Sequence, residues 1–431
     1  MAGRVSTTRV TAARMAAFRV LLAMERSPNT HCDELLRAPA MDSLSQADRN
    51  LTTALVMGVL RWQLALDSLL AGYLKKKFTL DDAVAIALRL GAWQLLGMDR
   101  IPPHAALSES VELTKVSGHS SASGMVNAVL RRVAEAEATI VLSPEKAHPA
   151  WVIQRWARHF GSDAAATIAA YDQQEPSVTV RDGATTQELP PGIFLTRARR
   201  LNGGVVPENA RIQDEGSQLV AEIAGNGSRI LDCCAAPGGK TAILAENNPQ
   251  AEITAVDISQ ARLNAMRHNF ARDSRNAAIR CVLADATDLP FRDNFDLILV
   301  DAPCSGTGTL ARNPEIKLRL AVSDFQRQQE RQIAILRSAY RVLLPGGRLV
   351  YSTCSLEPEE NSTVVETFLK EQTSARLLDI GERLKAMQDE GSLHRGGAEL
   401  LRESALRGSY LQTLPGLLPC DGFFVAVLTR K

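Results

Sequence analysis

Apolar residues recur at helical spacing from the start of the chain to about Val133. The earliest of them are Val10, Ala13, Ala17, Val20, Leu21 and Met24. Similar runs follow Asp48 and Asp81, and another follows the pair Pro102 and Pro103. Aspartate and proline are typical of helix starts, and the apolar–polar alternation of strands is missing from this stretch. The pattern therefore predicts an all-α bundle.

The N-terminal arginines offer a second interpretation of the first run. Arginine, serine and threonine with few acidic residues are typical of a cleaved transit peptide. The first 26 residues contain one acidic residue, Glu25, and five arginines, which are Arg4, Arg9, Arg14, Arg19 and Arg26. The helical spacing of the apolar residues favours the first helix of a folded domain, with a removed targeting segment as the alternative.

A linker punctuated by prolines, residues 135–148, separates this bundle from the next elements. A helix is predicted over Ala150–Phe160, ending at Gly161, which is a common residue after a helix end. A second helix is predicted over Asp163–Tyr171. The Pro- and Gly-rich residues 175–204 that follow contain short strand candidates.

The pattern changes from about Ser217, where short apolar runs alternate with helical ones. The short runs are Arg229–Leu231, Ile253–Val256, Ile279–Leu283, Leu297–Val300, Leu349–Tyr351 and Phe423–Leu428. Strands alternating with helices form crossover units, which predicts a mainly parallel, doubly wound sheet. Because ligands of such sheets bind beyond the carboxyl ends of the strands, the residues after each strand are the candidates for a site.

Composition limits the class of protein. A chain of 431 residues predicts two or three domains, and 45% hydrophobic with 23% charged residues is ordinary for a soluble protein. No segment approaches the run of uncharged apolar residues that a membrane span needs. The net charge of +1 means that any basic surface for nucleic acid must be local. Seven cysteines without a C-x-x-C motif predict neither a disulfide scaffold nor a metal site, so we expect a reduced, cytoplasmic protein.

The first strand ends in a turn of small residues that opens a helix. After Asp232 and Cys233 come Cys234, Ala235, Ala236, Pro237, Gly238, Gly239 and Lys240. Such a turn lets a ligand approach the backbone at a helix N-terminus, although a tight strand-to-helix turn is the plain alternative. The sequence matches neither G-x-G-x-x-G nor a Walker loop, which argues against dinucleotides and nucleoside triphosphates.

Carboxylates follow the second and third strands. Asp257 is placed to accept hydrogen bonds from the ribose hydroxyls of an adenosine, and Asp285 is placed to meet the adenine edge. Each alone could be a helix cap. Together with the turn they indicate an adenosine pocket without a pyrophosphate clamp, which suits S-adenosylmethionine.

Cysteines follow the next two strands. Cys304 lies in the run that begins at Asp301, and Cys354 lies in Ser352-Thr353-Cys354-Ser355. Because adjacent strands end side by side, both thiols are expected to face one cleft, although each alone could be a buried structural cysteine.

Methylation of cytosine at carbon 5 needs this chemistry. A thiolate adding to carbon 6 makes carbon 5 nucleophilic, and carbon 5 then attacks the sulfonium methyl. A base must next remove the carbon 5 proton so that the cysteine can leave. A carboxylic acid that hydrogen-bonds ring N3 stabilises the adduct, and Asp301 is placed for this.

These motifs resemble the RNA cytosine-C5 methyltransferases of the Nop2/Sun and bacterial RsmB (Sun or Fmu) kind. The matching runs are Asp232 to Thr241, Asp301-Ala302-Pro303-Cys304-Ser305, Tyr351-Ser352-Thr353-Cys354-Ser355, Pro358-Glu359-Glu360-Asn361 and Asp421-Gly422-Phe423-Phe424. The resemblance implies that Cys354 is the nucleophile and that Cys304 assists release of the methylated base. It also implies that the residues from Cys234 to Lys240 line the cofactor loop, and that Asp257, Asp285 and Asp301 contact S-adenosylmethionine or the base.

The N-terminal half resembles the NusB-like helical domain of the bacterial small-subunit ribosomal RNA enzyme. The matching runs are Gly58 to Trp62, Leu88 to Ala92, Arg100 to Ala106 and Val126 to Arg132. NusB-like domains bind RNA, so Arg61, Arg131 and Arg132 are candidate contacts, with plain solvated arginines as the alternative. The resemblance implies ribosomal RNA of the small subunit as the substrate.

The expected architecture is multidomain. Residues 1–140 are assigned to an all-α NusB-like bundle, 145–215 to a small α/β RNA-contacting segment, and 216–431 to an α/β Rossmann-like methyltransferase domain. Residues 375–414 match poorly and are expected to form a variable loop. We expect a monomer that binds ribosomal RNA and no membrane. The alternatives are a transfer RNA cytosine-C5 methyltransferase and a non-catalytic RNA-binding assembly factor.

Overall fold

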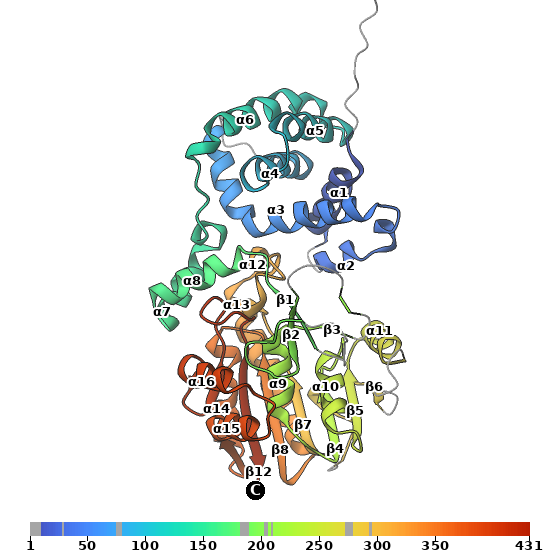
Figure 1. The fold of residues 1–431 in the computed structure, drawn as a ribbon, viewed down its shortest axis with the longest axis vertical. Helices are drawn as coiled ribbons and strands as arrows, with labels where there is room; N and C mark the ends of the chain where they lie inside the picture. The colour runs from blue at the N-terminus through green and yellow to red at the C-terminus, as the bar shows by residue number, and fades with distance from the viewer. Residues whose placement is uncertain are drawn as a thin grey trace, which may run out of the picture. The chain divides into compact units, whose positions relative to one another are not determined.

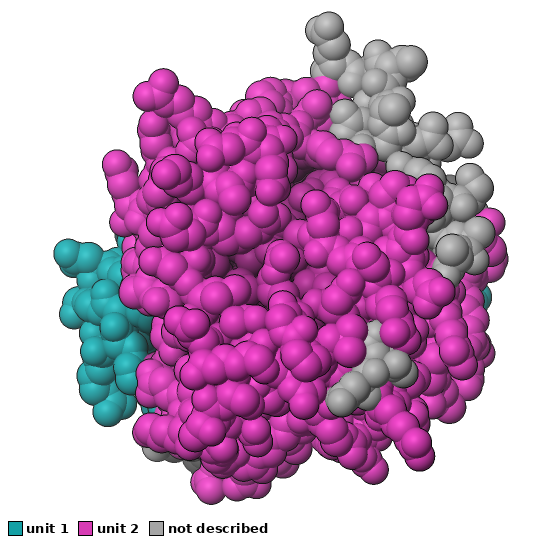
Figure 2. All heavy atoms as spheres, turned by 90° about the horizontal axis from the view of Figure 1, so that it is seen from below, with its two compact units in different colours: residues 1–174, 311–319 teal, residues 175–310, 320–431 magenta. Residues whose placement is uncertain are grey.

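The computed structural model describes residues 10–27, 30–74, 80–181, 189–201, 206–207, 210–271, 279–292 and 295–431. The chain forms two compact units, coloured separately in Figure 2. The helical unit comprises residues 1–174 and 311–319, and the sheet unit comprises residues 175–310 and 320–431.

The helical unit contains only helices in the part of it that the structure describes (Figure 1). Its α-helices are α1 (Ala12–Arg26), α2 (Cys32–Leu36), α3 (Gln46–Tyr73), α4 (Asp82–Gly97), α5 (Pro103–Val116), α6 (Ser123–Ala136), α7 (Ala150–Phe160), α8 (Ser162–Asp172) and α12 (Ile316–Arg319). Short 3-10 helices are η1 (Pro39–Met41), η2 (Ser120–Ala122), η3 (Glu137–Thr139) and η4 (Glu145–Ala147). The predicted all-α bundle is therefore confirmed.

Local signals in the sequence set the ends of these helices. The Ser45 hydroxyl accepts a hydrogen bond from the Asp48 amide at the start of α3, and the Asp81 carboxylate accepts one from the Ala83 amide at the start of α4. Such caps satisfy backbone donors that have no partner within the helix. Gly161 ends α7 with a φ of 91°, as predicted. The run that includes Ala17 lies on α1, whose apolar face is buried in the bundle.

Helices α3 and α4 pass through two apolar clusters of the helical unit. One cluster joins their first halves to α1, through side chains such as Leu21, Val59 and Ile86. The other joins them to α5 and α6, with Leu88 and Leu130 at its centre. Burial of apolar surface on both sides makes these two helices the core of the bundle.

Residues 311–319 reach the helical unit although they lie far along the chain, and we call them the anchor segment. Arg319 donates hydrogen bonds to the carbonyls of Thr30 (2.8 Å) and Met24 (3.3 Å). Buried Lys317 donates to the carbonyl of Arg61 (2.8 Å), and burial lowers the pKa of this lysine to about 7. The anchor segment is therefore held by polar contacts as well as by packing.

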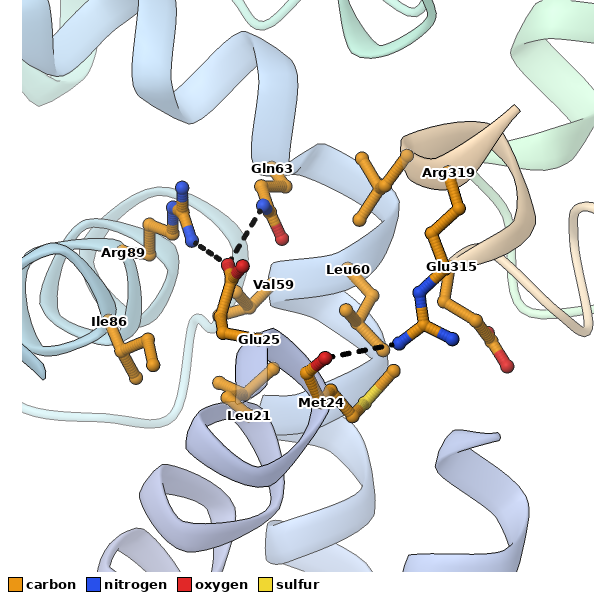
Figure 3. Close-up of a pocket in the computed structure, with 11 residues that line it drawn as sticks. Leu21, Met24, Glu25, Val59, Leu60, Gln63, Ile86, Arg89, Glu315 and Arg319 are labelled. Atoms are coloured by element: carbon orange, nitrogen blue, oxygen red, sulfur yellow. Dashed lines mark hydrogen bonds and ion pairs between the residues drawn. The ribbon is translucent and has the colours of Figure 1, made fainter. Parts of the chain in front are cut away.

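A small cavity of about 160 Å³ lies beside the anchor segment (Figure 3). Its polar lining is already engaged, because Glu25 pairs with Arg89 at 2.8 Å and Arg319 bonds the Met24 carbonyl. The remaining walls are largely aliphatic.

Helix α3 is long and apolar enough to cross a membrane by length and composition alone. It therefore departs from the expectation that no segment approaches a membrane span. A single such helix carries little weight, because a core helix of a soluble protein passes the same test. Residues such as Leu55 and Leu66 of α3 are buried in the bundle.

The sheet unit contains two sheets in its described residues. A small antiparallel sheet has the order β2-β1-β3, formed by β1 (Val178–Arg181), β2 (Ala198–Leu201) and β3 (Arg211–Ile212). Arg181 is buried and pairs with Glu222 (2.6 Å) and Glu246 (3.1 Å), two residues on the helices α9 and α10. These ion pairs fix β1 against helices α9 and α10.

The main sheet has the order β10-β11-β12-β8-β7-β4-β5-β6, with β9 paired to β12. Its strands are β4 (Arg229–Cys233), β5 (Glu252–Asp257), β6 (Arg280–Leu283), β7 (Phe295–Asp301), β8 (Leu343–Thr353), β9 (Ala375–Leu378), β10 (Leu406–Arg407), β11 (Tyr410–Gln412) and β12 (Phe424–Arg430). Strands β4 to β8 pair in parallel, and β9 to β12 are added in antiparallel pairs. The predicted doubly wound sheet is confirmed.

Helices cover both faces of this sheet (Figure 1). They are α9 (Glu215–Ala224), α10 (Gly239–Asn247), α11 (Gln260–Ala271), α13 (Val322–Arg341), α14 (Ser362–Glu371), α15 (Ile380–Asp389) and α16 (Arg395–Ser404), with the 3-10 helices η6 (Ala286–Asp288), η7 (Thr307–Thr309) and η8 (Pro358–Glu360). Along β7, Leu297 faces the cluster of α9, α15 and α16, whereas Ile298 faces that of α13 and α14. Both faces of a strand are buried, which explains why these strands appear as continuous apolar runs.

The expected variable loop at 375–414 is wrong. This stretch forms β9, α15, α16, β10 and β11, and Leu384, Met387 and Leu401 are buried in the core on one face of the sheet. The apolar residues of this stretch are spaced for burial in short helices, which explains why residues 375–414 form regular structure although they carry no recognisable motif.

Candidate active site

The carboxyl ends of the parallel strands are in register. Cys233 at the end of β4 pairs with Val256 of β5 and Val300 of β7, and Asp301 at the end of β7 pairs with Ser352 of β8. The residues that follow these strands therefore emerge along one edge of the sheet. This edge carries the residues that the sequence analysis singled out.

The turn after β4 holds a tight, left-handed path into α10. Gly238 has a φ of 100°, and a Cβ at this position would lie 2.8 Å from the ring of Phe270. Glycine is therefore required at this point, both for the backbone angle and for the space. Cys234 also has a positive φ, of 60°. The Ala235 amide donates to the Val256 carbonyl at 2.9 Å, which ties the turn to β5.

Asp257 and Asp285 occupy different environments. Asp257 is buried, and its carboxylate accepts hydrogen bonds from the amides of Ser259 (2.8 Å) and Ala236 (3.3 Å). It therefore lies against the turn after β4. Asp285 is exposed and caps η6 by accepting from the Thr287 amide at 2.9 Å, a bond that lowers the pKa of its carboxyl. Asp285 thus forms the helix cap that was the alternative interpretation of this residue.

Lys240 and Asp301 form an ion pair at the centre of the edge. The Lys240 Nζ donates to Asp301 Oδ2 at 2.7 Å, and the Ser352 hydroxyl donates to Asp301 Oδ1 at 2.7 Å. Burial acts to lower the pKa of Lys240, but attraction to Asp301, and more weakly to Cys354, raises it overall. Lys240 therefore carries its positive charge beside Cys354.

The structure brings the two thiols together. The Sγ atoms of Cys304 and Cys354 lie 3.4 Å apart, and both side chains are partly accessible. Hydrogen bonding to Cys354, together with burial and the nearby Glu360 carboxylate, raises the pKa of the Cys304 thiol. The two sulfurs thus have neighbours of opposite charge, because Lys240 lies beside Cys354 and Glu360 lies beside Cys304.

Sequence reasoning did not assign a role to two further residues. Buried Asp232 accepts a hydrogen bond from Thr241 (2.6 Å), and burial raises the pKa of this carboxyl to about 7. Buried Glu360 accepts bonds from Ser305 and Ser355, the residues that follow the two cysteines. Both lie in the matched motifs, so their motif membership was the available signal, but their contacts depend on the fold.

Sequence comparisons agree with the division into a helical part and a sheet part. The family described as 16S rRNA methyltransferase RsmB/F matches residues 222–429, and the NusB family matches residues 11–135. The chain is 31% identical to ribosomal RNA small subunit methyltransferase B of Xanthomonas campestris pv. campestris, with 97% of each chain covered. It is 32% identical to the protein of the same name from Pseudomonas putida, over 92% of this chain and 99% of that one.

Solved structures show the same fold. PH0851 superposes with a TM-score of 0.77 at 20% identity, covering 97% of this chain and 98% of the other. NSun6 from Pyrococcus horikoshii, solved with the S-adenosylmethionine analogue SFG, has a TM-score of 0.51 at 18% identity, covering 65% of this chain and 98% of that one.

The sheet unit is therefore an S-adenosylmethionine-dependent methyltransferase domain, and the predicted cofactor is confirmed at the level of the family. The residues of the edge fit this cofactor, because the N-terminus of α10 has no side-chain cap and Asp257 places a buried carboxylate against the turn after β4. The whole chain, helical part included, belongs to the RsmB family of ribosomal RNA small subunit methyltransferases.

Proposed function

We propose that this protein methylates carbon 5 of a cytosine in small-subunit ribosomal RNA through a covalent cysteine adduct. The observation that carries the proposal is the pair of thiols 3.4 Å apart beside the Lys240–Asp301 ion pair. Methylation of a ring nitrogen or a ribose hydroxyl needs no sulfur nucleophile. A second thiol is useful when a covalent adduct must also be resolved.

Cys354 is the proposed nucleophile. The positive charge of Lys240 lies close enough to attract a Cys354 thiolate, and thiolates are the reactive form of cysteine. The Cys304 thiol can donate a hydrogen bond to that thiolate across the 3.4 Å gap. Attack of the Cys354 sulfur on carbon 6 of the cytosine makes carbon 5 electron-rich. Bound S-adenosylmethionine supplies the electrophilic methyl group that carbon 5 takes up.

Asp301 and Cys304 have supporting roles in this proposal. Before the base binds, the bond from Ser352 and the ion pair with Lys240 hold Asp301 in place. In its protonated form the Asp301 carboxyl donates a hydrogen bond to cytosine N3, which offsets the charge that develops in the ring. After methyl transfer a base, Cys304 or a water, takes the carbon 5 proton, the 5,6 double bond re-forms, and the carbon 6–sulfur bond breaks to return the Cys354 thiolate; Cys304 assists this release.

The cofactor roles of the remaining residues extend the same proposal. The backbone from Cys234 to Gly239 receives the methionine part of the cofactor, Asp257 receives the ribose hydroxyls, and Asp285 receives the adenine edge. The three-part domain division, with 1–140 and 145–215 contacting RNA and 216–431 performing catalysis, also remains a proposal. The relatives' names favour ribosomal RNA over transfer RNA, and the same names favour a cytoplasmic enzyme. We further propose that the chain acts as a monomer.

Product mapping tests the reaction. The purified protein is incubated with methyl-labelled S-adenosylmethionine and either small-subunit ribosomal RNA or transfer RNA, and the labelled nucleosides are identified by mass spectrometry. We expect 5-methylcytosine in the ribosomal RNA alone. Label on another atom would contradict the chemistry, label in transfer RNA would contradict the substrate, and no label at all would support a non-catalytic assembly factor.

Cysteine variants test the mechanism. We expect Cys354→Ala to lose methylation by at least about a thousandfold, because the nucleophile is absent. We expect Cys304→Ala to accumulate a covalent protein–RNA adduct, visible on denaturing gels. Cys281→Ala, which removes a partly exposed cysteine on β6, serves as the control and should retain activity. An adduct that forms in Cys354→Ala but needs Cys304 would reverse the two roles.

A further inference from the structure

Glu360 occupies the junction of the two cysteine loops. It ends η8 in the sequence Pro358-Glu359-Glu360-Asn361, and it is buried. Its carboxylate Oε1 accepts from the Ser305 amide at 2.8 Å, and its Oε2 accepts from the hydroxyls of Ser305 and Ser355. Ser305 follows Cys304, and Ser355 follows Cys354. One carboxylate therefore connects the loop after β7 to the loop after β8.

The surrounding donors indicate an ionised carboxylate. The Ser355 hydroxyl accepts a hydrogen bond from the Glu357 amide at 3.0 Å and donates one to Glu360. Gln332 from α13 donates to Glu360 Oε1 at 3.4 Å and to the Pro303 carbonyl at 2.9 Å. Burial raises the pKa of Glu360 overall, and the bonds from Ser305 and Ser355 offset only part of this rise. Four donors to two oxygens compensate much of the cost of burying the charge.

This negative charge acts on the Cys304 sulfur. Glu360 raises the pKa of Cys304, after the larger effects of the Cys354 hydrogen bond and burial. Other titratable groups around the pair include the Tyr351 phenol, which shares an electrostatic interaction with Cys304, and Lys240, which attracts Cys354 and is itself paired with the Asp301 carboxylate. Glu357 in turn acts on Glu360 itself.

We propose that Glu360 is a positioning residue for the cysteine pair, holding the two loops at the separation the reaction needs and keeping Cys304 in its thiol form, so that Cys354 acts as the nucleophile. This inference rests on the proposed function for its catalytic meaning. Glu360 touches neither reacting sulfur through a hydrogen bond, so it acts through Ser305, Ser355 and its charge. Nothing in the motif alone distinguishes Glu360 from its neighbour Glu359, and the distinction comes from the contacts.

The charge effect is tested without RNA. In a Cys354→Ser background, the rate of Cys304 alkylation by iodoacetamide is followed against pH by peptide mass spectrometry. Adding Glu360→Gln should move the midpoint of this profile to lower pH by about one unit, the size expected for a charge at short range in a protein environment. Glu366→Gln, an exposed carboxylate on α14, is the matched control and should leave the midpoint in place. A profile unchanged by Glu360→Gln, or moved equally by Glu366→Gln, would overturn the proposal.

The positioning effect is tested by kinetics and by a shorter acid. Glu360→Asp keeps the charge but shortens the side chain, so the alkylation profile should stay near that of the parent while kcat falls. We expect kcat to fall about 10- to 100-fold in Glu360→Asp and Glu360→Gln, with KM for RNA and affinity for S-adenosylmethionine within about threefold of wild type. Wild-type kcat in both variants would overturn the proposal.

Serine variants keep the test open if changes at Glu360 prevent folding. Ser305→Ala and Ser355→Ala each remove one donor to the carboxylate and leave the acid in place. Each should lower kcat by about tenfold while S-adenosylmethionine still binds, and unchanged kcat in both would overturn the proposal. Because alkylation needs no RNA, an absence of 5-methylcytosine with the wild-type protein would refute the proposed function and leave the alkylation result to decide the role of Glu360.

Discussion

Asp232 shows how burial changes a single carboxyl at the residue scale. Its pKa rises from 3.8 to about 7 because the charged form is desolvated, and the bond from Thr241 and the charge of Lys240 offset only part of that effect. One of its oxygens has no hydrogen-bond partner among the described residues. In the unfolded chain the same carboxyl ionises near its usual pKa.

This shift predicts how Asp232→Asn changes stability with pH. Between about pH 4 and pH 7 the folded protein keeps a proton that the unfolded chain releases, so wild-type stability falls as pH rises through this window. Asparagine cannot ionise. The free energy of unfolding of the variant should therefore rise relative to that of the wild type by up to about 1.4 kcal/mol per pH unit in that window. Hydrogen exchange of β4 amides, compared between the two proteins at each pH, measures the difference.

Asp285→Asn is the control for this prediction. Asp285 is exposed and the bond from the Thr287 amide lowers its pKa, so its contribution to stability is lost only as pH falls below its usual range. The difference between Asp285→Asn and wild type should be flat from pH 4 to pH 7. A flat difference for Asp232→Asn as well would mean that the Asp232 carboxyl titrates normally.

Strand-end reasoning predicted which residues lie at one edge of the sheet but not the contacts that support them. The placement of Asp257, Asp301, Cys304 and Cys354 could be predicted because parallel strands end at one edge, so their order along the chain implies proximity. Glu360 could not, because its partners Ser305 and Ser355 come from two loops whose packing is set by tertiary contacts. Asp285 shows that position alone does not define a role, because it follows a strand as a ligand-binding residue would, yet its side chain caps η6.

At the scale of elements, the strand and helix predictions succeeded where burial is two-sided or capping is clear. The runs around Leu231 and Ile298 became β4 and β7, and α7 began and ended at the predicted residues. The prediction of a variable loop at residues 375–414 failed because the two helices of this stretch are short and bury only one face. The anchor segment had no local signal, because its partners lie more than 250 positions earlier in the chain.

The anchor segment leads to a prediction on stability. Arg319→Ala removes two charge-assisted hydrogen bonds to backbone carbonyls, which should cost the helical unit about 1.5–3 kcal/mol. The chain has four tryptophans, Trp62, Trp93, Trp151 and Trp156, and all belong to the helical unit. Urea unfolding followed by tryptophan fluorescence therefore reports on this unit.

Arg327→Ala provides the comparison. Arg327 is exposed and pairs with Asp324 one helical turn away on α13, a surface pair worth at most about 1 kcal/mol. Its loss should leave the fluorescence transition unchanged. An Arg319→Ala transition that coincides with wild type would show that packing alone holds the anchor segment.

On the scale of the whole molecule, a net charge of +1 gives no general attraction to RNA, so binding must depend on particular basic residues. The structure separates the three arginines named from the sequence. Arg61 donates to the Ala311 carbonyl and holds the anchor segment, and Arg132 donates to the Tyr73 carbonyl and lies over the Tyr73 ring. Arg131 is exposed on α6, with no partner among the described residues.

Arg131 is therefore the arginine whose loss should weaken RNA binding without disturbing the fold. If its guanidinium contacts one phosphate, Arg131→Ala lowers the slope of log affinity against log salt by about 0.9. Between 50 and 200 mM salt the variant should then lose roughly threefold less affinity than wild type. Arg131→Lys keeps the charge and should retain the wild-type slope, while Arg61→Ala should lower the urea midpoint of the helical unit instead. Equal slopes for wild type and Arg131→Ala would place the RNA contact elsewhere, and a lowered urea midpoint in Arg131→Ala would mean that this arginine, too, serves the fold.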